Sequence, residues 1–289
     1  MKKWIAAFRL KTLPLALGSI ILGSRIHDLS FDFRIFMLAC TTAILLQILS
    51  NLANDYGDFV KGTDKHRNDR QLAGGSITPK AMRIAIFIFS AGALVSGIFL
   101  LNASFQDNWV LWFQFLLLGL GSIAAAILYT VGKKAYGYMG LGDVFVFIFF
   151  GLVGVVGTSY LFKQEIPLSS WLLAVGYGCL CVGVLNVNNI RDLDKDILTN
   201  KITIAAKLGL QGAIFYQGVL LSVACFAFMV HHFVVLYYSF APLLILGIGL
   251  VHMQRLKSAY SAADYNQQLK FLSLSSLGVV LVFLIRLFF

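Results

Sequence analysis

Charged side chains are scarce in this sequence: Asp, Glu, Lys and Arg together make up 12% of its 289 residues. Water-soluble domains carry about twice that share, which argues against an ordinary soluble protein. Hydrophobic residues account for 59% and gather in long uncharged stretches. Backbone polar groups in a bilayer must be satisfied internally, so only helices or closed barrels span it. Because the alternating strands of a barrel are missing, the sequence predicts an all-α, polytopic membrane protein.

The uncharged stretches predict about nine transmembrane helices, which we expect to surround a central cavity in a single domain, 1–289. The first stretch, 12–24, is short for a hydrocarbon core of roughly 30 Å. Lys11 and Arg25 must therefore extend to the membrane surface, or Phe8–Leu10 must enter as well. The stretch 208–254 is long enough for two helices, with a turn expected at His231–His232. The other predicted spans are 35–54, 84–106, 108–132, 144–162, 166–190 and 271–285.

Cysteine is also rare, and its placement argues against a metal or redox role. The chain has four cysteines, all within predicted spans. Cys179 and Cys181 are close together, but no second pair or nearby histidine completes a zinc-site pattern. We interpret all four as small residues of the helical core.

The basic residues are distributed unevenly between the two ends of the predicted spans. Of the 23 Lys and Arg residues, only Arg25, Arg34, Lys163 and Arg286 fall on one side, leaving 19 on the other. The positive-inside rule then places the N-terminus in the cytoplasm. The net charge of +10 is accounted for by this topology together with an anionic ligand, and it does not indicate nucleic-acid binding.

Polar side chains extend into the inner end of the second predicted span. Asn51, Asn54 or Asp55, and Asp58 recur at steps of three and four residues, so they share one helix face. Polar side chains inside a span are costly and usually face the bundle interior or a wet cavity. This face therefore predicts a polar site at the cytoplasmic end of the span.

A similar pattern follows the sixth predicted span. Asn188, Asp192 and Asp196 repeat the order of an amide followed by two acids stepping outward. The two sites lie four predicted helices apart, which places them on the same side of the membrane. The sequence therefore predicts a weak internal repeat of two four-helix halves.

Basic residues follow each acidic site, and the combination indicates a metal-bound anion. Carboxylates suit Mg²⁺, which keeps one or two of them together with substrate phosphate, and Lys and Arg neutralise the remaining phosphate charge. The expected metal ligands, which we also expect to be catalytic, are Asp55, Asp58, Asp192 and Asp196. The expected substrate-binding residues beside them are Asn51, Asn54, Lys61, Asp64, Arg67, Arg70, Asn188, Arg191 and Lys201.

A diphosphate site at the end of a helical bundle fits a lipid diphosphate, with the apolar tail between helices. Metal and basic side chains would stabilise the leaving diphosphate. The allylic cation left behind needs an electron-rich pocket without water, which aromatic faces supply. Tyr129, near the inner end of the fourth predicted span, is the best single candidate for this role.

Three other interpretations compete with this one. The basic loops can be ordinary positive-inside charge with the acids paired to it. A cation-coupled transporter would need acids near the bilayer midplane, whereas the predicted spans have none at mid-depth. A phosphatidyl-alcohol synthase would need an Asp-Gly-x-x-Ala-Arg motif, and this sequence contains no Asp-Gly.

The stretches "NDYGDFVKGTD" and "NNIRDLDKD" resemble the paired aspartate motifs of the UbiA superfamily of intramembrane aromatic prenyltransferases. The segments "RQLAGGSIT" and "NKITIAAKLG" are similar to the loop segments of that family. Three stretches, the last of which includes the second aspartate motif, resemble its branch that acts on 1,4-dihydroxy-2-naphthoate in menaquinone biosynthesis. These are "FRLKTLPLALGSIILGS", "LYTVGKKAYGYMGLGDVFVFIFFGLVGVVGTSY" and "NVNNIRDLDKD".

The resemblance implies a nine-helix, Mg²⁺-dependent enzyme of the bacterial inner membrane whose site faces the cytoplasm. It would transfer a polyprenyl group from polyprenyl diphosphate to 1,4-dihydroxy-2-naphthoate with loss of CO₂ and diphosphate, giving demethylmenaquinone. Another aromatic acceptor, such as 4-hydroxybenzoate or homogentisate, is the alternative within the family. Beyond the lipid bilayer, no obligate protein partner is evident.

The resemblance also suggests residues for the acceptor. Lys11 and Arg9 would lie near the acceptor carboxylate, whereas composition alone makes Lys11 a surface anchor. Asp143 stands where that branch more often has Glu, which keeps the carboxylate and shortens its reach by one methylene. We expect it to be catalytic by accepting a hydrogen bond from a ring hydroxyl.

Overall fold

The computed structural model describes residues 2–24, 31–63, 70–132, 135–235 and 239–285, and this part of the chain is helical without strands. The prediction of an all-α protein is therefore confirmed. The elements are α1 (Lys2–Phe8), η1 (Leu10–Thr12), α2 (Leu13–Gly23), α3 (Phe33–Lys61), α4 (Pro79–Phe105), α5 (Trp109–Leu128), η2 (Tyr136–Tyr138), α6 (Gly142–Val146), the π-helix η3 (Phe147–Gly157), α7 (Thr158–Lys163), α8 (Leu168–Arg191), α9 (Leu193–Leu198), α10 (Ile204–Val234), α11 (Ala241–Lys257) and α12 (Ala262–Leu284).

Eight helical segments of the described chain are long and apolar enough to cross a membrane. The remaining predicted span corresponds to α11, which has 17 residues, so the expectation of about nine is consistent with the structure. The first segment runs from Lys2 to Gly23, so the helical segment is longer than the uncharged stretch 12–24 and is long enough to span the membrane. Arg9, with a positive φ of 49°, interrupts it between α1 and η1.

One predicted boundary is wrong. The turn expected at His231–His232 does not exist, because α10 continues to Val234 and α11 begins at Ala241. Both histidines lie in the last turn of α10, and histidine has no backbone restriction that would end a helix at its own position. The next proline, Pro242, lies in the first turn of α11, where its fixed φ and missing N–H are tolerated.

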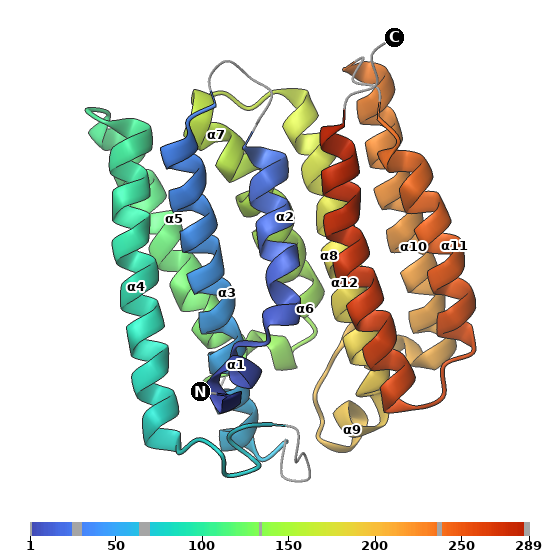
Figure 1. Cartoon of the computed structure of the whole chain (residues 1–289). Helices are drawn as coiled ribbons and strands as arrows, with labels where there is room; N and C mark the ends of the chain where they lie inside the picture. The colour runs from blue at the N-terminus through green and yellow to red at the C-terminus, as the bar shows by residue number, and fades with distance from the viewer. Residues whose placement is uncertain (1, 25–30, 64–69, 133–134, 236–238, 286–289) are drawn as a thin grey trace. The chain divides into compact units, whose positions relative to one another are not determined.

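The chain forms two compact units, of which the first comprises residues 1–13 and 32–139. In it α3, α4 and α5 pack side by side (Figure 1). Asp32 accepts hydrogen bonds from the backbone N–H groups of Arg34 and Ile35 and begins α3. Gly57 lets the end of α5 approach, since a Cβ there would lie 2.6 Å from Thr130 Oγ1. This close approach brings the chain after α5 against the acidic end of α3.

The second unit comprises residues 14–31 and 140–289, and α8 is its central helix. α8 packs against η3, α10 and α12 and buries the whole side chain of Tyr177. Gly151 and Gly154 allow close packing of η3, because a Cβ would meet Ala174 O at 2.6 Å or Ser19 Cβ at 2.7 Å. Close packing is therefore the role of these two glycines.

A chain of four buried polar side chains joins α8, α10, α11 and α12. Asn186 Nδ2 donates to Gln217 Oε1 at 2.9 Å, and Gln217 Nε2 lies 3.2 Å from His252 Nε2. His252 Nδ1 lies 3.0 Å from Gln268 Oε1. The His252 side chain is fully buried. Because buried polar groups are costly when unpaired, this network favours one arrangement of the four helices.

Replacing His252 by Leu keeps the volume but removes a hydrogen-bond partner from both Gln217 and Gln268. We expect a loss of about 1 to 3 kcal/mol in the free energy of unfolding, because a buried polar group left without a hydrogen-bond partner costs on that order. The lower end of this range applies if the bonds are as weak as those measured between membrane helices. A denaturant titration of the purified protein in detergent measures this. Gln254→Leu, an exposed position on the same helix, is the matched control and should change the stability little.

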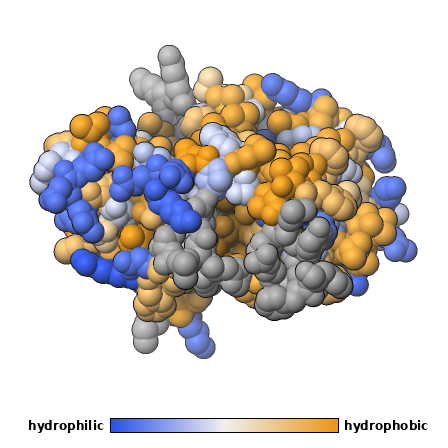
Figure 2. Space-filling view, turned by 90° about the horizontal axis from the view of Figure 1, so that it is seen from above, coloured by the Kyte–Doolittle hydropathy of each residue, from blue (hydrophilic) through white to orange (hydrophobic). Residues whose placement is uncertain are grey.

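The outward-facing side chains are largely apolar, as expected for a surface in contact with lipid. Phe87, Phe113 and Phe215 are 73%, 57% and 75% exposed. In the view from above (Figure 2), onto the helix ends, hydrophobic groups lie among hydrophilic ones. With the eight apolar segments, the exposed apolar side chains make the chain an integral membrane protein.

Candidate functional site

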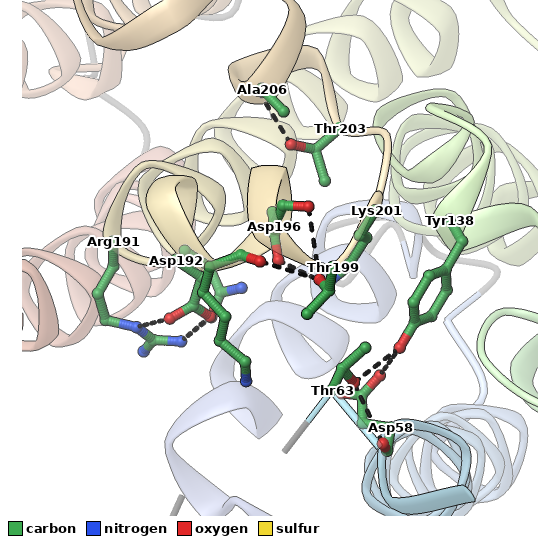
Figure 3. A network of polar contacts seen from close by, with 12 residues as sticks. Asp58, Thr63, Tyr138, Arg191, Asp192, Asp196, Thr199, Lys201, Thr203 and Ala206 are labelled. Atoms are coloured by element: carbon green, nitrogen blue, oxygen red, sulfur yellow. Dashed lines mark hydrogen bonds and ion pairs between the residues drawn. The ribbon is translucent and has the colours of Figure 1, made fainter. Parts of the chain in front are cut away.

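Asp58 lies near the C-terminal end of α3 in a cluster of polar side chains (Figure 3). The Tyr138 hydroxyl donates to Asp58 Oδ1 at 2.6 Å and lies 3.0 Å from Thr63 Oγ1. Lys61 Nζ stands 3.8 Å from the centroid of the Tyr138 ring. Tyr138 therefore holds the carboxylate of Asp58 in place and lies against one of the predicted cations.

The amides that precede Asp58 have structural partners. Asn51 Nδ2 donates to Phe8 O at 2.9 Å and to Thr12 Oγ1 at 3.0 Å. Asn54 Oδ1 accepts from Thr130 Oγ1 at 3.3 Å. Both donor hydrogens of Asn51 are thereby used to tie the N-terminal segment to α3. Its predicted role in substrate binding would rest on Oδ1.

Asp55 lies between these two amides and Asp58 along α3. Its side chain is 2% exposed, and that of Asp58 is 8% exposed. Two buried carboxylates about one turn apart near the end of a helix agree with the predicted shared face.

The second acidic cluster begins where α8 ends. Arg191 donates to both oxygens of Asp192, from Nε at 2.9 Å and from Nη2 at 2.6 Å. Its Nη2 also reaches Asn188 Oδ1 at 2.8 Å, and its Nη1 reaches Asn266 Oδ1 at 2.7 Å. The pairing of Arg191 with Asp192 is drawn in Figure 3. Arg191 was expected to bind substrate, but these four bonds direct its guanidinium to protein acceptors.

Asp196 lies on the separate short helix α9, whereas Asp58 is part of the continuous α3. Lys201 Nζ lies 3.5 Å from Asp196 Oδ1. Burial raises the pKa of Asp196 to about 6, against the lowering effect of Lys201, and the Asp192 carboxylate raises it further. Asp196 Oδ2 is buried and accepts no hydrogen bond from the described residues. A divalent cation would favour the charged form and use this oxygen.

The candidates for the acceptor lie on three elements. Lys11 is exposed on η1, directly after Arg9 and Leu10. Asp143 is 4% exposed in the first turn of α6. Its side chain interacts with that of Tyr216 on α10, and its Oδ1 is buried without a hydrogen-bond partner among the described residues.

The remaining predicted residues flank these clusters. Tyr129 follows the last residue of α5, and its ring centroid lies 5.3 Å from that of Tyr136 in an edge-to-face pair. Arg70 is partly buried. Asp64 and Arg67 lie outside the described residues.

The residues that sequence reasoning missed are Tyr138, Thr63 and Asn266. Thr63 stands two residues beyond Lys61, so its position in the acidic loop was the signal available for it. Tyr138 and Asn266 are distant in sequence from their partners Asp58 and Arg191, and no spacing pattern pairs them. Tyr138 does lie in one of the stretches that resemble the naphthoate branch.

No group of three or more His, Cys, Asp and Glu side chains among the described residues is close enough to hold a metal alone. The donor set is instead two carboxylates in each cluster, with a buried free oxygen on Asp196. Mg²⁺ is usually bound by one or two carboxylates together with substrate phosphate. The residues present therefore fit this cation.

The fold and these clusters define a polytopic helical membrane protein with two carboxylate pairs, each at the end of a membrane helix. Residues 12–277 match the UbiA prenyltransferase family. The chain therefore belongs to this family. This confirms the resemblance found in the sequence motifs.

Among its relatives are enzymes named for a naphthoate acceptor. The chain is 42% identical to the 1,4-dihydroxy-2-naphthoate octaprenyltransferase of Haemophilus influenzae over 236 residues, which cover 79% of this chain and 76% of that protein. It is also 42% identical to the enzyme of the same name from Escherichia coli over 231 residues, 78% of this chain and 75% of the other.

Solved structures support the fold. A UbiA homolog from Archaeoglobus fulgidus superposes with a TM-score of 0.69 at 13% identity, covering 98% of both chains. A structure of a homolog from the same organism bound to GPP and Mg²⁺ has a TM-score of 0.67 at 12% identity, covering 97% of this chain and all of the other. At these identities the likeness concerns the fold alone.

Proposed function

We propose that this protein transfers a polyprenyl group from polyprenyl diphosphate to 1,4-dihydroxy-2-naphthoate, giving demethylmenaquinone in its hydroquinone form, CO₂ and diphosphate. The two carboxylate pairs at the ends of α3 and α8–α9 carry the proposal for the reaction class. The acceptor rests on the identity to the naphthoate enzymes. Formation of the prenylated, decarboxylated product by the purified protein tests it.

We infer that Asp55, Asp58, Asp192 and Asp196 hold about two Mg²⁺ ions with the diphosphate. The bound metal would neutralise the negative charge that develops as diphosphate leaves. Tyr138 orients Asp58, and Arg191 orients Asp192, so each carboxylate is fixed before substrate binds. Such preorganisation lowers the cost of stabilising the transition state.

The proposed reaction breaks the bond between the first prenyl carbon and the diphosphate oxygen, and its electron pair leaves with diphosphate. The naphthoate ring carbon that bears the carboxylate forms the new carbon–carbon bond. Loss of the carboxylate as CO₂ returns an electron pair to the ring. The protein must keep water from the allylic carbon, and aromatic faces such as Tyr129 can stabilise its positive charge.

We propose that residues 1–289 act as one prenyltransferase domain in the bacterial cytoplasmic membrane. The family match runs through both compact units. The excess of basic residues at one set of helix ends supports a cytoplasmic N-terminus and cytoplasmic acidic clusters.

Lys11, Arg9 and Asp143 would position the acceptor. A cation near the naphthoate carboxylate orients the ring, and Asp143 would accept a hydrogen bond from a ring hydroxyl and make the adjacent carbon more nucleophilic. The free Oδ1 of Asp143 supports this role.

Lys11→Ala and Asp143→Asn are expected to raise the KM for the naphthoate by about 10-fold or to lower kcat, which matches the loss of one charged hydrogen bond. The KM for polyprenyl diphosphate should stay nearly unchanged. Initial rates with each substrate varied in turn measure both values. Lys3→Ala, an exposed lysine on α1, is the control. A change in the diphosphate KM instead would assign these residues to the other substrate.

A further inference from the structure

A groove of about 600 Å³ lies between α10 and α11 in the second unit. Its walls are apolar side chains and glycines, among them Gly218, Leu221, Cys225, Leu246, Leu250 and Met253. Leu246 and Leu250 are 52% and 67% exposed. The groove is therefore open toward the surrounding lipid beside these two leucines, and no residue of the proposed prenyl-transfer site lines it.

The lining of the groove becomes polar at the C-terminal end of α11. Gln254, Lys257, Ser258 and Tyr260 line it there. Lys257 is exposed, and none of the described residues forms an ion pair with it. Tyr260 is 90% exposed, and tyrosine is enriched at the level of the lipid headgroups. One end of an apolar groove thus carries an available cation and polar groups.

This polar end lies on the same side of the unit as the acidic cluster of α8 and α9. The bond between Arg191 Nη1 and Asn266 Oδ1, 2.7 Å long, places the first turns of α12 beside the end of α8. Residues 258–261 alone connect α11 to α12. The mouth of the groove therefore lies at the basic, cytoplasmic membrane surface inferred from the sequence.

We propose that this groove binds an anionic phospholipid, with one acyl chain along the apolar walls and the headgroup phosphate at Lys257. The amide of Gln254 and the hydroxyl of Tyr260 can donate further hydrogen bonds to the phosphate. Basic pockets between helices on the cytoplasmic side are suited to anionic headgroups. The proposal is independent of the prenyl-transfer reaction.

The lining argues against the diphosphate substrate as the occupant. No Asp or Glu is among the described residues that line the groove, so the groove offers no carboxylate to hold Mg²⁺ beside a diphosphate. A phosphodiester carries a single negative charge and needs one cation. Lys257 supplies that charge.

The experiment is native mass spectrometry of the full-length protein released from detergent, with phosphatidylglycerol and phosphatidylcholine of identical acyl chains added separately. The wild type should retain phosphatidylglycerol more strongly. Lys257→Gln should reduce that preference about fivefold, the effect of one lysine near a charged headgroup, and Lys257→Arg should restore it. Lys270→Gln, an exposed lysine of α12 at the same end, is the matched control and should keep the preference.

A second variant tests the apolar part of the groove. Gly218→Leu would place a side chain in it, since a Cβ at Gly218 already lies 3.5 Å from Met253 Cε. We expect weaker retention of both lipids. Equal retention of the two lipids by the wild type would overturn the proposal, as would equal effects of Lys257→Gln and Lys270→Gln. Displacement of phosphatidylglycerol by polyprenyl diphosphate would show that the groove binds the substrate, and this result would also overturn the proposal.

Discussion

Asp55→Asn and Asp192→Asn are each expected to lower the turnover number by about 100- to 1,000-fold, the range found when one preorganised electrostatic group is removed from an active site. The amide keeps the shape of the side chain but removes the negative charge that attracts a divalent cation. Asp55 is buried in α3, and Asp192 is held by Arg191. The measurement is the rate of prenyl transfer by purified variants at saturating substrates.

Asp194→Asn is the matched control for this prediction. Asp194 lies on α9 between Asp192 and Asp196, but its side chain is exposed. We expect this variant to keep nearly normal activity. Near-normal activity of both Asp55→Asn and Asp192→Asn in detergent would show that these carboxylates do not hold the metal.

Removal of divalent cations is expected to abolish prenyl transfer, and added Mg²⁺ should restore it. The carboxylate pairs and the diphosphate are all negative, so without a cation they repel one another. Binding gives a readout apart from activity: EDTA should weaken the retention of polyprenyl diphosphate by the wild type. Phosphatidylglycerol retention, which needs no metal, serves as the control.

Full activity and unchanged diphosphate binding after exhaustive chelation would contradict the assignment of the carboxylates. In that case the cations Lys61 and Lys201 would have to neutralise the diphosphate on their own.

The membrane helices could be predicted because uncharged stretches of sufficient length have few alternatives in lipid. The acidic face of α3 was also predictable, since Asn51, Asp55 and Asp58 recur at helical spacing and α3 runs without a break to Lys61. The boundary between α10 and α11 was predicted at the wrong position. The stretch is apolar throughout, so neither hydropathy nor the histidines marked its turn.

The contacts that fix the acidic side chains could not be predicted. Tyr138 reaches Asp58 only because the chain after α5 folds back against α3, and Gly57 permits that approach. Asn266 meets Arg191 only because α12 packs against α8. Such partners depend on tertiary packing, and the local sequence holds no periodicity that would pair them.

The difference between the two acidic clusters could not be predicted from the sequence either. The sequence pattern made Asn188, Asp192 and Asp196 look like a copy of the face on α3. In the structure α8 ends at Arg191 and Asp196 lies on α9. The spacing survives because the backbone N–H of Asp196 still donates to Asp192 O at 2.8 Å.

The most direct test of the central claim is a product assay with the purified protein, Mg²⁺ and a polyprenyl diphosphate. Each reaction contains one aromatic acceptor, chosen from 1,4-dihydroxy-2-naphthoate, 4-hydroxybenzoate and homogentisate, and the products are identified by mass. We expect a product only with the naphthoate, with a mass equal to the acceptor plus the prenyl group minus CO₂ and one hydrogen atom. A prenylated product from another acceptor and none from the naphthoate would contradict the proposed function.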